Sequence, residues 1–144
     1  MHGRPDGTTL LVLFNHHGEA VEPVFPLPGE PHYEEIALRG MSTMLPALRA
    51  YQGQPARAHV DGGYYVRTKE NRPLIGPLPG VEGAYSSCAY SGFGVMASCA
   101  GGDLVARHVT GAALPDYAGA FALSRYQDPS YTALLASWGE DGQL

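Results

Sequence analysis

The chain has 144 residues, of which 44% are hydrophobic and 16% charged, so its composition is that of a globular protein rather than a disordered one. Its net charge is −5 and its nine basic residues form no stripe, which argues against a nucleic-acid-binding surface. No run approaches the roughly 18 apolar residues of a membrane span, and the N-terminus lacks the apolar core of a signal peptide. We therefore expect a cytoplasmic protein with no membrane partner.

The first 25 residues predict two strands that follow a frayed N-terminus. Residues 1–7 are polar and are expected to be frayed, whereas the apolar run Thr8–Phe14 predicts a buried strand. A turn at Asn15–Gly18 and a short strand at Val21–Phe25 are expected next.

A proline-rich loop and a helix follow. Prolines at positions 23, 26, 28 and 31 predict an extended loop. From His32 onward apolar side chains recur at helical spacing. Pro46 predicts the end of this helix near Leu45, because the residue before a proline avoids helical angles.

The middle of the chain predicts short strands joined by turns. Arg57–Thr68 is expected to be a strand with a bend at Gly62 and Gly63. Lys69–Arg72 predicts a polar turn, Pro73–Ile75 a short strand, and Gly76–Gly83 a loop.

Ala84–Thr110 is the most informative segment, because it predicts a buried strand, a tight glycine turn and a helix of small residues. Gly92, Gly94 and Ala97 form a G-x-G-x-x-A pattern at the start of the helix. Such a turn lets a backbone approach a ligand, and a helix N-terminus offers N–H groups to negative charge. A complete dinucleotide fold also needs a second strand with an acidic residue about 20 residues on, which is absent. A ligand-facing turn and a turn that only packs helix on strand both stay open.

The remaining residues predict little regular structure. Asp116–Tyr126 is expected to be irregular or briefly helical, Tyr131–Trp138 a short helix, and Gly139–Leu144 a tail. Cys88 and Cys99 are expected to be buried free thiols, with a disulfide or metal pair as the alternative.

Few side chains outside the glycine turn suggest chemistry. Tyr64, Tyr65 and Arg67 could wall a pocket and bind a carboxylate through the arginine fork, or could simply belong to a half-buried edge strand. The adjacent His16 and His17 lack the spacing of helical metal ligands, so no metal is expected.

Three motifs, taken in order, resemble the C-terminal region of FAD-dependent oxidoreductases of the D-amino-acid oxidase, glycine oxidase and sarcosine oxidase type. The first is the turn T-x-[DE]-x-x-P-x-[IL]-G, here Thr68–Gly76. The second is the strand V-x-G-[AL]-Y, here Val81–Tyr85. The third is S-G-[HF]-G-[IV]-M, here Ser91–Met96, which a helix of small residues follows. The resemblance is strongest over Asp61–Tyr126.

The resemblance implies that the third motif faces the pyrimidine end of the flavin, where N–H groups stabilise the negative charge of the reduced ring. The residues implied to line the isoalloxazine are Gly92, Phe93, Gly94, Val95 and Met96. Gly63 stands where sarcosine oxidases attach flavin through a cysteine, so the implied FAD is non-covalent. Met96 stands where those enzymes have a lysine near the flavin, and the electron acceptor is left open.

The resemblance also implies a substrate side. Glycine oxidases place a carboxylate-binding arginine about where Tyr65 stands, and Arg67 lies two residues on along the same predicted strand face. Tyr65 and Arg67 are therefore the implied substrate-binding residues. The family's ADP-binding G-x-G-x-x-G is absent, so we expect either a truncated product or a subunit to which a second chain supplies the missing FAD-binding half.

These inferences give an expected α+β fold. Residues 8–75 would form part of a substrate-binding domain with an antiparallel sheet and one helix, and residues 76–144 would add the terminal strand and helix of a Rossmann-like FAD-binding domain. The expected function is part of an FAD-dependent oxidoreductase acting on the C–N bond of an amine or amino acid, inactive alone. The alternative is a non-catalytic interaction module or remnant that binds no cofactor. A stand-alone NAD-binding protein ranks last.

Overall fold

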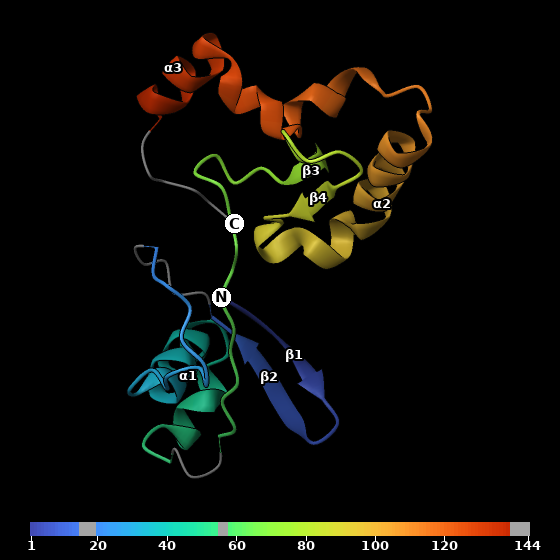
Figure 1. Ribbon diagram of the computed structural model, residues 1–144. Coiled ribbons are helices and arrows are strands. Elements are labelled where there is room, and N and C mark those ends of the chain that lie inside the picture. The colour runs from blue at the N-terminus through green and yellow to red at the C-terminus, as the bar shows by residue number, and fades with distance from the viewer. Residues whose placement is uncertain (15–19, 55–57, 139–144) are drawn as a thin grey trace. The chain divides into compact units, whose positions relative to one another are not determined.

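The computed structural model describes residues 1–14, 20–54 and 58–138 and contains two compact units, Met1–Tyr64 and Tyr65–Leu144 (Figure 1). Each unit combines helix with a two-stranded antiparallel sheet, so the mixed α+β class is confirmed. The units divide earlier in the chain than the boundary expected after residue 75, which falls inside a strand. The expected turn at Asn15–Gly18 and tail at Gly139–Leu144 lie outside the described residues.

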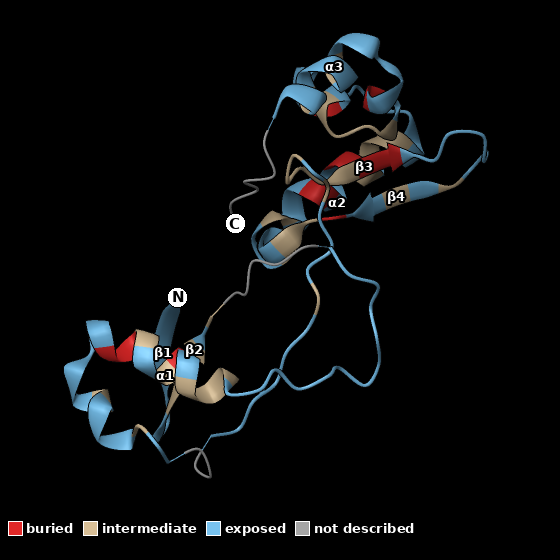
Figure 2. Cartoon of the chain, turned by 90° about the vertical axis from the view of Figure 1, so that its left-hand side faces the viewer, coloured by how far each residue is buried: buried red, intermediate tan, exposed pale blue. Residues whose placement is uncertain are grey.

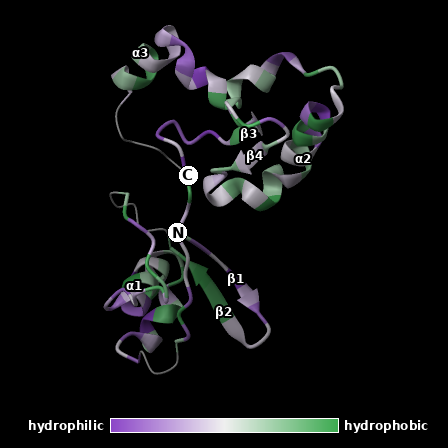
Figure 3. Ribbon diagram, in the orientation of Figure 1, coloured by the Kyte–Doolittle hydropathy of each residue, from purple (hydrophilic) through white to green (hydrophobic). Residues whose placement is uncertain are grey.

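The first unit begins with a hairpin of β1 (His2–Asp6) and β2 (Thr9–Leu13). The expectation that residues 1–7 are frayed is wrong. Asp6 pairs with Thr9, and the two residues between them, Gly7 and Thr8, make a tight hairpin turn with Gly7 at φ 58°. The strand expected at β2 is confirmed and is green in Figure 3, but its residues alternate between half-buried and exposed. A two-stranded sheet next to one helix buries only one face, so β2 is not the fully buried strand expected.

Helix α1 (Tyr33–Met44) confirms the helix expected from His32, and its last residue is followed by Leu45 and Pro46 as predicted. A 3-10 helix, η1 (Pro46–Tyr51), continues the chain. Ala37 and Met41 are the buried apolar residues of α1 and form the core of this unit.

The strand expected at Val21–Phe25 is absent, and residues 20–30 are irregular. The loop predicted from the prolines therefore extends over this segment too. Pro23 and Pro26 lack N–H donors, so they weaken any ladder that the segment could form.

The second unit is built on a hairpin of β3 (Leu74–Pro77) and β4 (Tyr85–Cys88), in which Leu74 pairs with Cys88. Helix α2 (Gly94–Thr110) packs on this hairpin and ends at Gly111, which adopts the left-handed conformation at φ 69°. The strand–turn–helix order is thus confirmed. β4 is largely exposed rather than buried, because it belongs to a sheet of only two strands.

The strand expected over Arg57–Thr68 does not form. Residue 57 lies outside the described residues, and from 58 to 68 the backbone makes a single isolated bridge, between Arg67 and Tyr90. The consecutive glycines 62 and 63 raise the entropy cost of an extended ladder, and this segment spans the division between the two units.

The C-terminal part confirms the expected short helices. Two 3-10 helices, η4 (Asp116–Ala120) and η5 (Leu123–Gln127), precede helix α3 (Pro129–Ser137). Asp128 caps α3 by accepting a hydrogen bond from the Ser130 amide at 2.8 Å. None of the helices in residues 1–14, 20–54 and 58–138 is both long and apolar enough to cross a membrane.

The core of the second unit lies between β3, α2 and η4. Figure 2 shows buried residues gathered on β3 and on the side of α2 that faces it. The buried apolar residues of this cluster, with those packed against them, are Ile75, Leu104, Ala118, Tyr90, Val105 and Phe121. This core fixes α2 on the hairpin and so positions the turn at residues 91–96.

Candidate functional site

The two segments expected to bind substrate and cofactor lie next to each other in the second unit. The amide of Ser91 donates a hydrogen bond to the carbonyl of Val66 at 3.0 Å, and Arg67 and Tyr90 form a β-bridge. Residues 65–67 therefore lie alongside the residues that open the glycine turn, although they are far apart in sequence. We call residues 65–67 and 90–91 the junction.

The turn after the junction presents apolar side chains to solvent. Residues 91–93 form a short 3-10 helix that leads directly into α2. Val95 is 92% exposed and Met96 75%, and Phe93 and Gly92 are exposed as well. The first turn of α2 has no side-chain cap. Its N–H groups are therefore not occupied by a capping side chain, which is the condition for contact with an electron-rich ligand.

The backbone angles show that the turn itself does not need a glycine at position 94. Gly94 has ordinary helical angles, φ −53° and ψ −45°, and a Cβ at Gly94 would meet only the Tyr90 Cβ at 3.6 Å. The left-handed residues are instead Ala89 and Ser91, at φ 61° and 53°. Such angles are uncommon for residues with a side chain and often accompany functional sites. Nothing in the described chain requires a glycine at position 94.

The expected cluster of Tyr64, Tyr65 and Arg67 is divided between the two units. Tyr65 and Arg67 are both exposed in the second unit and belong to the junction. Tyr64 belongs to the first unit, where its hydroxyl accepts a hydrogen bond from the Val24 amide at 3.2 Å. Its ring also packs edge-on against Phe25. Tyr64 therefore anchors the proline-rich loop.

The two cysteines differ from expectation in their exposure. Both are free thiols, but Cys88 and Cys99 are exposed rather than buried. Cys88 is the last residue of β4, with its sulfur 3.2 Å from the Ser86 hydroxyl. Among the described residues, no three side chains of the metal-binding types form a cluster.

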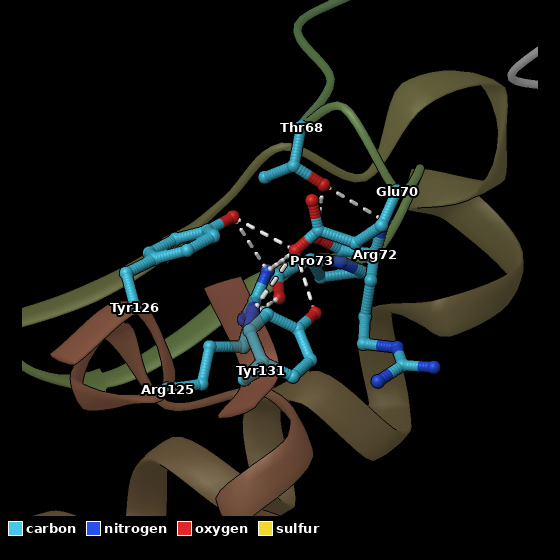
Figure 4. A network of polar contacts seen from close by, with 7 residues as sticks. All are labelled: Thr68, Glu70, Arg72, Pro73, Arg125, Tyr126 and Tyr131. Atoms are coloured by element: carbon cyan, nitrogen blue, oxygen red, sulfur yellow. Dashed lines mark hydrogen bonds and ion pairs between the residues drawn. The ribbon is translucent and has the colours of Figure 1, made fainter. Parts of the chain in front are cut away.

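A buried ionic network, which the sequence did not predict, involves the segment that follows residues 65–67 (Figure 4). The carboxylate oxygen Oε1 of Glu70 accepts two hydrogen bonds from Arg125, at 3.0 Å from Nε and 2.6 Å from Nη2. The hydroxyls of Tyr126 and Tyr131 donate to the same oxygen at 2.8 and 3.0 Å. The Glu70 side chain is fully buried and that of Arg125 is 3% exposed. We call these four residues the Glu70 network.

Arg125 also binds the backbone of the turn before β3. It donates to the carbonyl of Pro73 at 3.0 Å and to that of Arg72 at 3.2 Å. The Thr68 hydroxyl closes the same turn, donating to the Arg72 carbonyl and accepting from the Arg72 amide. Figure 4 shows the Arg72 side chain pointing away from the network, and the segment before β3 is purple in Figure 3.

The electrostatics of the network hold it in the ionised form. Burial by itself raises the pKa of Glu70, but hydrogen bonds from its own backbone amide, Arg125 and the two tyrosines outweigh burial and lower the pKa from 4.5 to about 2. Burial lowers the pKa of Arg125, but the bond to Glu70 raises it overall. Burial and the bond to Glu70 raise the pKa of Tyr126 and of Tyr131.

Comparison with models of known protein families, with curated proteins and with solved structures returns no significant match for this chain. The function must therefore be argued from the junction, the exposed turn and the motifs in the sequence.

Proposed function

We propose that the chain is part of an FAD-dependent oxidoreductase that acts on the C–N bond of an amine or amino acid, in the manner of the D-amino-acid oxidase, glycine oxidase and sarcosine oxidase family. The observation that carries the proposal is the junction, because residues 65–67 of the implied substrate side hydrogen-bond to the start of the implied flavin side. The exposed apolar turn at Phe93–Met96 supports it, since a planar ring is a suitable cover for such a surface.

The residues present are compatible with an isoalloxazine ring. The structure has room for a Cβ at position 94, so packing within the chain does not explain the glycine there. Close approach of a bound ring to the backbone would explain it. The uncapped N-terminus of α2 would place N–H groups and the positive end of the helix dipole toward the pyrimidine end of the ring. The lining residues are Gly92, Phe93, Gly94, Val95 and Met96.

FAD, when bound, would accept a hydride from the C–H next to the substrate amine, and the imine produced would hydrolyse. The chain's own part is to hold the ring at α2 and the substrate at the adjacent segment. Arg67 would bind the substrate carboxylate through its planar fork, and Tyr65 would wall the pocket. The FAD is held without a covalent bond, and a second chain supplies the part that binds its ADP moiety.

In this proposal β4 and α2 are the terminal strand and helix of a Rossmann-like FAD-binding domain, and the hairpin β1–β2 with α1 belongs to the substrate-binding domain. The proposal assigns the protein to the cytoplasm. The substrate is a small amine or amino acid.

Two glycine variants of α2 test the flavin site. Adding FAD to the purified chain should perturb the flavin absorbance spectrum and quench its fluorescence. Gly94→Val should abolish both changes, because its side chain would occupy the space of the ring. Gly102→Val is the matched control, since Gly102 lies in the same helix with nothing within 4 Å of an added Cβ. It should bind flavin like the original chain.

Circular dichroism of the three proteins should be alike, because the backbone at Gly94 is already helical. A chain whose addition leaves the flavin spectrum unchanged would instead support a non-catalytic interaction module that binds no cofactor. Equal flavin binding by the Gly94→Val and Gly102→Val proteins would show that the turn does not contact the ring.

A further inference from the structure

We propose that Arg125 is a positioning residue for the junction: through Glu70 and the turn at Thr68–Pro73 it holds the substrate-side segment against the start of the flavin-side turn. This inference rests on the proposed function for its meaning, but the coupling itself is a property of the second unit. Arg125 lies in η5, after α2, whereas Glu70 and the turn precede β3.

The first step of the coupling is the set of hydrogen bonds from Arg125 to the turn at Thr68–Pro73. Its guanidinium donates to two side chains, the Glu70 carboxylate and the Tyr126 hydroxyl. It also donates to two backbone carbonyls, those of Arg72 and Pro73, at 3.2 and 3.0 Å. The planar fork of arginine carries five N–H donors in fixed directions and so reaches all four acceptors, which the three donors of a lysine ammonium on a flexible stem cannot reproduce. Because Arg125 and Glu70 are buried, neither can exchange these partners for water.

The second step leads from the turn to the junction. Thr68 closes the turn by bonds to residue 72 at 2.8 and 2.9 Å and accepts the Asn71 amide at 3.0 Å through its carbonyl. Arg67, the neighbour of Thr68, is the residue that bridges to Tyr90. If the hydrogen bonds of Thr68 are lost, Arg67 is therefore less firmly positioned. Its bridge to Tyr90 sets the distance between the two sides of the candidate site.

A third contact fixes the position of the segment that carries Arg125. The amide of Ile75, on β3, donates to the carbonyl of Phe121 at 2.9 Å. The segment that carries Arg125 is thus attached to the strand that follows the turn, so Arg125 approaches the turn from a fixed position. The hydroxyls of Tyr126 and Tyr131 orient Glu70 from the same segment and from α3.

Amide hydrogen exchange of the isolated chain, without flavin, tests the coupling. In Arg125→Lys the amides of Asn71, Arg72 and Ser91 should exchange about 10- to 100-fold faster, as expected when buried hydrogen bonds are lost. Amides in the middle of α2, around Leu104, should keep their rates. Arg39→Lys is the matched control, since its pair with Glu35 is an exposed ion pair on α1 and should change none of these rates.

Tyr131→Phe removes one hydrogen bond to Glu70 and keeps the ring, so it provides a milder variant if Arg125→Lys does not fold. It should accelerate the same three amides by a smaller factor. Equal acceleration around Leu104 would make Arg125 a general stabilising residue, and an unchanged Ser91 rate would show that the junction is independent of Arg125; either result overturns the proposal. Because no flavin is present, a failure of the proposed function leaves this result unaffected.

Discussion

At the scale of single residues, the second unit depends on one buried ion pair. An isolated charge costs several kcal/mol to bury, and Glu70 and Arg125 offset this cost only because each has several hydrogen-bond partners. Replacing one member leaves the other buried and uncompensated. The exposed pairs of the chain, such as Arg107 with Asp103, lack this property because water solvates both charges.

Glu70→Gln should therefore lower the free energy of unfolding of the second unit by about 3–5 kcal/mol. The only tryptophan, Trp138, follows α3, so denaturant unfolding monitored by its fluorescence reports on this unit. Asp103→Asn is the matched control in the same unit and should change the transition little. A Glu70→Gln midpoint equal to that of the original chain would contradict the account of the network.

The same carboxylate predicts an acid sensitivity with a definite sign. The folded pKa of Glu70 is about 2, below the ordinary value of 4.5, so its contribution to stability is complete above pH 4.5 and is lost as pH falls toward 2. Unfolding of the second unit followed by Trp138 fluorescence should thus become easier over this range. The stability difference between the original chain and Glu70→Gln should shrink there, and a constant difference down to pH 2 would argue against the assignment.

At the scale of elements, α2 packs against the Tyr90 ring, which follows the β3–β4 hairpin, at Gly101. A Cβ at Gly101 would overlap the Tyr90 hydroxyl, which is also 2.8 Å from the Ser87 hydroxyl. Gly102, the next residue, faces open space. Of these two adjacent glycines, only Gly101 is therefore required for packing within the described chain.

Gly101→Ala should destabilise the second unit by about 1–3 kcal/mol, because the Tyr90 ring must move from its place over the helix. Gly102→Ala should instead stabilise it by up to about 1 kcal/mol, since alanine favours the helical backbone and meets no neighbour. Thermal unfolding of both variants checks the prediction. Equal effects of the two substitutions would mean that Tyr90 does not pack on Gly101.

The elements show which parts of the fold are local enough to be predicted. Helices α1 and α2 follow from periodicity, from Pro46 and from the glycine after Thr110. The hairpin at residues 2–13 was not expected, because its first strand is polar and the turn at Gly7 and Thr8 is its only local signal. The strand expected over 57–68 required a pairing partner, which neighbouring residues cannot reveal.

The Glu70 network could not be predicted for a related reason. Glu70 and Arg125 lie 55 residues apart, and no spacing or composition connects them. The only signal available was Glu70 within the Thr68–Gly76 motif, where it was assigned to a polar turn. Conversely, the strand–turn–helix order at residues 84–110 was predicted from the sequence, because G-x-G-x-x-A at a strand–helix connection is a local pattern. The role of the turn in lining a flavin comes from the family resemblance and stays a prediction.

At the scale of the whole molecule, a chain that lacks an ADP-binding motif should not turn over substrate. The pyrophosphate of FAD would have no helix N-terminus to bind it, so flavin would be held by the turn at α2 alone. We expect no bleaching of added FAD under anaerobic conditions with sarcosine, glycine or proline. Bleaching by the isolated chain would show that the site is complete within these residues.

The most direct test of the central claim is a titration of the isotope-labelled chain with FAD, followed by amide NMR. The account predicts that the amide resonances of residues 65–67 and 91–97 shift together, and that those of β1, β2 and α1 do not. Shifts restricted to other residues, or no shifts at all, would contradict the assignment of a flavin site to the junction and the turn that follows it.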